Sequence, residues 1–106
     1  MSTAWAGSQR GWRIGKDRAQ TALEVVLADR TYLLPWAQFI YAEGGDNEVH
    51  LVFATHDVVA RGAGLNELLA ELAAQRVIGL DQPGRAERFG SPARGICELT
   101  VRKVDA

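Results

Sequence analysis

The chain of 106 residues lacks several features that mark particular classes of protein. A single cysteine excludes an internal disulfide and suits a reducing compartment. No apolar run approaches the roughly 18 residues of a membrane span, and no signal peptide is recognised. Twelve basic and thirteen acidic side chains leave a formal charge of −1, without the excess of one sign typical of nucleic-acid binders or acidic tails. We therefore expect a cytoplasmic protein with no membrane partner.

What the chain does contain is the composition of an ordinary folded domain. Apolar residues make up 47% and charged residues 24%, and the abundance of Ala, Arg and Gly suits a GC-rich bacterial genome. Residues 1–11 are small and polar apart from Trp5, which predicts a flexible N-terminal arm. Residues 12–106 then form one small α+β domain. Residues 81–95, with Pro, Gly and no periodicity, predict a mobile loop within it.

Alternating apolar and polar residues predict strands through the first half of the domain. Residues 23–27, 48–54 and 58–61 show this period of two. Residues 31–42 are rich in aromatic and β-branched side chains, and Pro35 divides them into two pieces of one interrupted strand, residues 32–34 and 37–42. The connections between these strands are short, which favours an antiparallel meander.

The period changes after the fourth predicted strand. Leucines at positions 65, 68, 69 and 72 follow the helical spacing, so a helix is expected over residues 65–75. A short extended piece at 77–80 and a strand at 96–104 complete the chain. The predicted fold is an α+β antiparallel sheet of about five strands with one main helix packed on one face, in the order β-β-β-β-α-β. The expected core consists of Leu23, Val25, Leu27, Phe39, Val49, Leu51, Phe53, Leu65, Leu68, Leu69, Leu72, Cys97, Leu99 and Val101.

One helix covers only one face of such a sheet, so the second face needs another cover. Val26, Trp36, Ile40 and Val52 are predicted to share that face. Exposed apolar surface of this kind marks an interaction site. These four residues are therefore the candidate interface, with a second copy of the chain or another protein as the partner, and a homodimer is the favoured assembly.

Arginines near glycines supply a candidate anion-binding site. Arg61 precedes Gly62 and Gly64 at the predicted strand-to-helix junction, where helix amides attract anions. The dinucleotide fingerprint is incomplete there, because Glu67 occupies the position of its third glycine. Three more arginines stand in the predicted loop, so the candidate anion-binding set is Arg61, Arg85, Arg88 and Arg94.

Catalytic and metal-binding chemistry is weakly represented. His50 and His56, with Glu48 and Asp57, supply potential metal ligands, but the expected turn at residues 55–57 separates the two histidines. An enzyme using Glu43, His50 or His56 is the least supported alternative. Cys97 alternates with Leu99 and Val101, which predicts a buried, unreactive thiol. We expect no catalytic residue, no cofactor and no metal.

A β-β-β-α pattern runs through the middle of the chain. A Leu34-Pro35 start is followed by Ile40-Tyr41-Ala42-Glu43, a hairpin, a strand, Gly62 and the leucine-striped helix. Over residues 34–72 this pattern resembles the LytTR-type DNA-binding domain, which implies DNA binding. The basic His-Arg-Ser stretch typical of that family after the helix is replaced here by Ala-Gln-Arg-Val-Ile-Gly at residues 74–79.

From the sequence, the favoured function is that of a small bacterial-type protein-interaction or structural module, without catalysis, that self-associates. The alternative is a nucleic-acid or anionic-ligand binder that uses the four arginines. Steep salt dependence of binding to a polyanion distinguishes the two.

Overall fold

The computed structural model describes residues 11–15, 21–83 and 95–104. The predicted arm at residues 1–11 lies outside these described residues except for residue 11. The predicted loop at 81–95 does so except for residues 81–83 and 95, and residues 81 and 95 belong to strands. Within them the chain forms β1 (Trp12–Ile14), β2 (Ala22–Val26), β3 (Thr31–Pro35), the 3-10 helix η1 (Trp36–Gln38), β4 (Phe39–Gly44), β5 (Glu48–Phe53), β6 (His56–Ala63), α2 (Asn66–Ala73), β7 (Val77–Asp81) and β8 (Gly95–Lys103).

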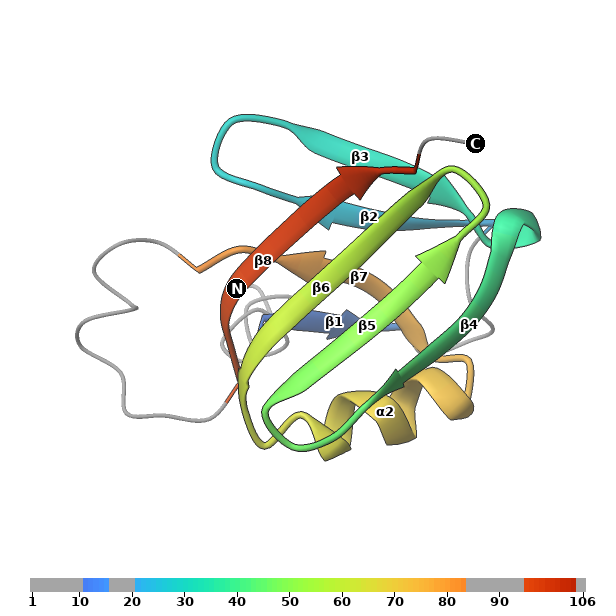
Figure 1. Cartoon of the computed structure of the whole chain (residues 1–106). Helices are drawn as coiled ribbons and strands as arrows, with labels where there is room; N and C mark the ends of the chain where they lie inside the picture. Colours follow the sequence, from blue (N-terminus) through green and yellow to red (C-terminus); the bar gives the residue numbers. More distant parts are fainter. Residues whose placement is uncertain (1–10, 16–20, 84–94, 105–106) are drawn as a thin grey trace.

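The strands belong to two sheets (Figure 1). The rear sheet has the order β1-β7-β2-β3, and the front sheet has the order β4-β5-β6-β8. The α+β class and the largely antiparallel pairing are confirmed, with one α-helix in the described ranges. The prediction of a single sheet of about five strands is wrong, because the chain passes between two sheets three times: after β3, after β6 and after β7.

The first crossing takes place at the 3-10 turn after Pro35. The amide of Trp36 still donates to Thr21 O beside β2 at 2.9 Å, whereas Gln38 O accepts from Ala54 N beside β5 at 2.8 Å. The turn is thus hydrogen-bonded to both sheets, and residues 32–34 and 37–42 are not two pieces of one strand. Pro35 marks the break because proline has no amide hydrogen with which to continue the ladder.

The second crossing is made by α2, which follows β6 in the front sheet and leads to β7 in the rear sheet. The extended piece expected near residues 77–80 is therefore a full strand. It runs parallel to β2 and antiparallel to β1. Short connections favoured a meander, but a helical crossover allows parallel pairing, and that pairing inserts β7 between two strands from the start of the chain.

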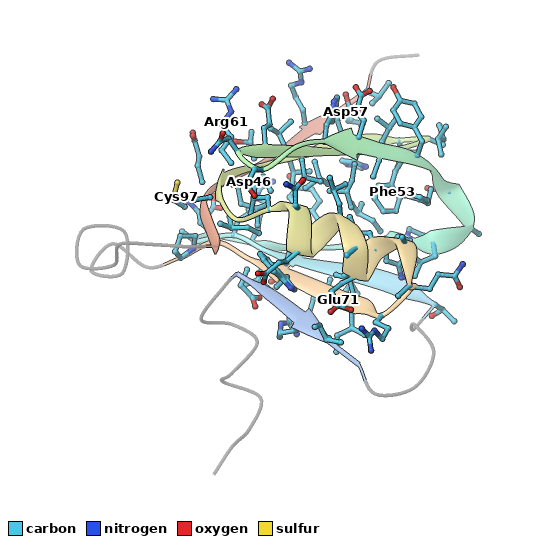
Figure 2. All side chains as sticks on the ribbon, turned by 90° about the horizontal axis from the view of Figure 1, so that it is seen from below. Asp46, Phe53, Asp57, Arg61, Glu71 and Cys97 are labelled. Atoms are coloured by element: carbon cyan, nitrogen blue, oxygen red, sulfur yellow. The ribbon has the colours of Figure 1, made fainter. Side chains whose placement is uncertain are left out.

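The core lies between the two sheets, and α2 closes one end of the space between them (Figure 2). Leu65 and Leu68 are fully buried, whereas Leu69 and Leu72 are half-buried, so the predicted helical stripe faces the interior. No helix in the described residues is long and apolar enough to cross a membrane. The buried residues are Trp12, Leu23, Val25, Leu34, Val49, Leu51, Phe53, Val58, Ala60, Leu65, Leu68, Val77, Leu80, Ile96 and Leu99.

Cys97 is the one predicted core residue that the structure exposes. On β6, Arg61 pairs with Glu98 and Gly62 pairs with Ile96, so Cys97 is an extra residue in β8. Such a β-bulge shifts the alternation of side chains by one position. Ile96 and Leu99 are both buried for this reason, and Cys97 points away from the interior (Figure 2). The expectation of a buried thiol is wrong.

Candidate functional site

The glycine-containing junction between β6 and α2 is occupied by the turn that joins β4 and β5. Gly64 N–H donates to a carboxylate oxygen of Asp46 at 3.1 Å, and Leu65 N–H donates to the carbonyl of Asp46 at 2.9 Å. Gly62 N–H donates to Asn47 O at 3.0 Å. The amides that an anion needs are therefore already bonded within the protein, and Asp46 brings a negative charge to the same place.

Arg61 extends from β6 beside this junction and is engaged by carboxylates. Its Nε donates to Glu48 Oε2 at 3.1 Å, and its Nη1 lies 3.9 Å from Glu98 Oε1. These residues form one row across the outer surface of β5, β6 and β8. Two carboxylates balance the charge of Arg61, which weakens it as a phosphate contact. Arg85, Arg88 and Arg94 lie outside the described residues.

The two histidines have different neighbours. His50 Nε2 is 3.7 Å from Asp57 Oδ2, which is beyond hydrogen-bonding distance. His56 instead has Nδ1 2.9 Å from Thr55 Oγ1, and its ring meets the edge of Tyr32 at 5.4 Å. No group of three potential metal ligands is found among the described residues. Both side chains are half-buried, and the Nε2 of His50 is buried without a hydrogen-bond partner among the described residues. The contact of His56 with Tyr32 joins the front sheet to the rear sheet.

A charged cluster that the sequence analysis missed lies on the outer face of the rear sheet. Arg13 on β1 donates twice to the carboxylate of Asp81, at 2.8 and 2.9 Å, and its Nη1 is 2.8 Å from Glu24 on β2. Gly79 on β7 makes room for the guanidinium, because a Cβ there would overlap it. The alternation of Arg13 between Trp12 and Ile14 was the available signal, since it places Arg13 on the face opposite Trp12.

Arg13 is also the one described residue whose pKa is clearly displaced. Burial disfavours its charge, but hydrogen bonds and attraction from Asp81 and Glu24 outweigh that effect, so the pKa is raised above its ordinary value. The guanidinium of Arg13 therefore stays charged, and its contacts with the two carboxylates join β1, β7 and β2. The cluster is saturated with its own partners, and we assign it to the stability of the rear sheet.

The four predicted interface residues are not brought together. Val26 belongs to the rear sheet, whereas Ile40 and Val52 belong to the front sheet. Trp36 is half-buried at the turn between the sheets and packs on Phe39 and Phe53 with ring centroids 5.3 and 5.8 Å apart. The physical basis for grouping them was the second face of a single sheet, and that face does not exist.

A different apolar feature emerges from the fold. Residues 31–42, which we name the uncharged segment, contain no charged side chain and supply β3, η1 and the first four residues of β4. β3 is an edge strand of the rear sheet, and β4 is an edge strand of the front sheet. Leu33, Ile40 and Tyr41 in this segment are 67%, 58% and 48% exposed, more than any other large apolar side chain that the structure describes.

Comparisons with protein-family models, with curated proteins and with solved structures find no match for this chain.

Proposed function

We propose that this chain is a non-catalytic interaction module that associates with a second copy of itself through the uncharged segment. One observation carries the proposal: a single run of residues, 31–42, builds an edge strand in each sheet and holds the three most exposed large apolar side chains described. Scattered exposed apolar residues are normal on protein surfaces. Their concentration along two edge strands is typical of a binding surface.

Burial of this segment supplies the driving force for association. Removing apolar surface from water is worth roughly 25 cal/mol per Å². A contact between two copies buries the same segment twice, and two-fold dimers are the commonest closed assembly. A cytoplasmic location is part of the proposal and is supported by the exposed thiol of Cys97, which a reducing compartment keeps free.

The test is the oligomeric state of the intact chain by sedimentation velocity, over protein concentrations from about 1 to about 100 µM, which spans typical weak dimer affinities. We expect a monomer–dimer equilibrium. The double variant Leu33→Lys/Tyr41→Lys should be monomeric, because lysine is costly to bury and blocks strand edges. Thr100→Lys is the matched control, because Thr100 is exposed on the charged strand β8.

Two results would contradict the proposal. A monomer at every concentration would remove self-association. Retention of the chain on a heparin column with steep salt dependence would instead favour the alternative function, nucleic-acid or anion binding by the arginines. The ion pairs of Arg61 with Glu48 and Glu98 lead us to expect weak retention that is lost at low salt.

A further inference from the structure

The free edge of β3 has the features of a strand that pairs with its own copy. We infer that two chains associate by antiparallel pairing of β3 with the partner's β3, about a two-fold axis at Leu33, so that the two rear sheets become one. This inference rests on the proposed self-association and names the surface and the register that produce it.

The hydrogen bonds of the β2–β3 hairpin determine which backbone groups of β3 are free. Leu27 N–H donates to Arg30 O at 2.8 Å, and Trp36 N–H donates to Thr21 O at 2.9 Å. Hydrogen-bonded pairs alternate along an antiparallel ladder, so Tyr32 and Leu34 direct their backbone groups toward β2. Thr31, Leu33 and Pro35 direct theirs to the open side. Leu33 thus combines the most exposed large apolar side chain described with an amide and a carbonyl that have no partner among the described residues.

The other three edge strands have structural features that prevent pairing with a further strand. β1 is three residues long and bears Arg13. β4 has a bulge at Ile40, shown by the register shift between Phe39 and Tyr41, and contacts α2. β8 has its bulge at Cys97 and ends on Lys103. Short length, bulges, covering elements and charge are the known protections of sheet edges.

β3 has none of these protections along its centre. Its five residues contain no charge and keep a regular register with β2. No other labelled strand or helix lies beyond its outer edge (Figure 1). Pro35 removes one amide, but only at the last residue of the strand. An edge strand of this kind is a template for another strand.

Pro35 and the exposed Leu33 together select the register of the pairing. With Leu33 opposite the partner's Leu33, the two residues exchange two N–H···O=C bonds. Each Thr31 N–H then donates to the carbonyl of the partner's Pro35, and the ladder ends where proline lacks a hydrogen. Four hydrogen bonds form in this register. A shift of two residues that sets Leu33 opposite the partner's Pro35 leaves two bonds, because proline cannot donate. The opposite shift, with Leu33 opposite the partner's Thr31, keeps four bonds but separates the two exposed leucines.

The side chains beside this ladder are compatible with a like strand. Leu33 would meet the partner's Leu33 on the outer face, and the next position on each side pairs Thr31 with the partner's Pro35. Glu24 is the residue opposite Leu33 on β2. Its charge is already paired with Arg13 at 2.8 Å. The cluster on the rear sheet therefore reduces repulsion between two copies.

A disulfide test resolves the register. In a Cys97→Ser background, which removes the exposed native thiol, we compare Leu33→Cys with Thr31→Cys under mild oxidation. Directly opposite residues in a hydrogen-bonded pair have Cα atoms about 5.5 Å apart, inside the range for disulfides. The partner's Thr31 is displaced by four residues, about 13 Å along the strand. We expect Leu33→Cys to form a covalent dimer at least tenfold faster than Thr31→Cys, and circular dichroism verifies that both variants fold.

A mixture of Thr31→Cys and Pro35→Cys chains provides the second measurement, because these positions are opposite each other in the same register. Its heterodimeric cross-link is expected to exceed either homodimeric one. If the native chain dimerises but Leu33→Cys cross-links no faster than Thr31→Cys, β3 pairing is wrong and the proposed self-association stands. If the native chain is monomeric, the proposed function fails and the inference fails with it.

Discussion

The edge strands β3 and β8 of this small domain differ in charge, regularity and exposed apolar surface. β8 carries Glu98, Arg102 and Lys103 and is interrupted by the bulge at Cys97. β3 is regular, uncharged and exposes Leu33. Both strands are paired on one side only. The difference therefore lies in side-chain chemistry and regularity: β8 is kept from pairing with other strands, whereas β3 is left able to do so.

The charged side chains on the outer surfaces of the two sheets also leave β3 uncharged. On the front sheet, Arg61 lies between Glu48 and Glu98 in an exposed row. On the rear sheet, Arg13 gathers its carboxylates over β1, β7 and β2, and the neighbouring β3 remains free of charge. Ion pairs at exposed positions contribute little stability but do discourage wrong contacts.

The largest effect is expected from Leu68→Ala, which tests whether both edges depend on one core. Leu68 is fully buried on α2, and its truncation should lower the free energy of unfolding by about 2–5 kcal/mol. Denaturant titration measures this loss, and Leu72→Ala, at a half-buried position, should cost less. Amides of β5 and of β2 should lose protection from hydrogen exchange together. Loss in one sheet alone would show that the sheets unfold separately.

A smaller effect is expected from Arg13→Ala, which tests whether charge on the rear sheet is structural. Each charge-assisted hydrogen bond of a partly buried group contributes about 1.5–3 kcal/mol to stability, and relaxation of the variant recovers part of that. We therefore expect the free energy of unfolding to fall by about 1–3 kcal/mol. Arg30→Ala is the control, because Arg30 is exposed and lies 3.9 Å from Asp29. Its effect should be within about 0.5 kcal/mol.

The pH dependence of this variant has a definite sign. Because the pKa of Arg13 is raised above its ordinary, strongly basic value, its contribution is fully present below that ordinary value and is lost only above it. The destabilisation by Arg13→Ala should therefore be equal at about pH 6 and about pH 9. A loss that disappears at the higher value would contradict the assigned ion pairs.

Lys103→Thr sharpens the contrast between the two edges. If the bulge at Cys97 protects β8 together with Lys103, removing the charge alone should change the dimer dissociation constant by less than about threefold. Sedimentation velocity of the variant measures the change. A tenfold lower dimer dissociation constant, or visible aggregation, would show that Lys103 alone prevents β8 from pairing with another chain.

The smallest expected effect is on the reactivity of Cys97, with no change in stability. Cys97 lies exposed on the bulge, so a thiol reagent should modify it in the native protein without denaturant. The rate should be within about tenfold of the rate in the unfolded chain, as for an accessible thiol. Protection by several orders of magnitude would mean that Cys97 points inward and that the bulge is misplaced.

Local patterns were sufficient to predict most of the elements. The leucine spacing placed the helix at residues 65–75, and α2 spans Asn66–Ala73. Alternation at residues 23–27 and 48–54 matches β2 and β5 within two residues. Alternation failed at Cys97, because a bulge depends on how β8 pairs with β6, which is distant in the sequence. The cluster of Arg13, Glu24 and Asp81 was missed for the same reason, since β1, β2 and β7 meet only in the folded sheet.

The sequence by itself determined which segments are helix or strand, which side chains are apolar, and that residues 31–42 carry no charge, because these properties depend on near neighbours. Only the tertiary structure decided that this segment divides between two sheets, that each part lies at an edge, and that Leu33 directs its backbone groups away from β2. The physical reason is that every strand must hydrogen-bond its backbone to a neighbour. The choice of neighbour is made by packing two sheets and a helix around one core.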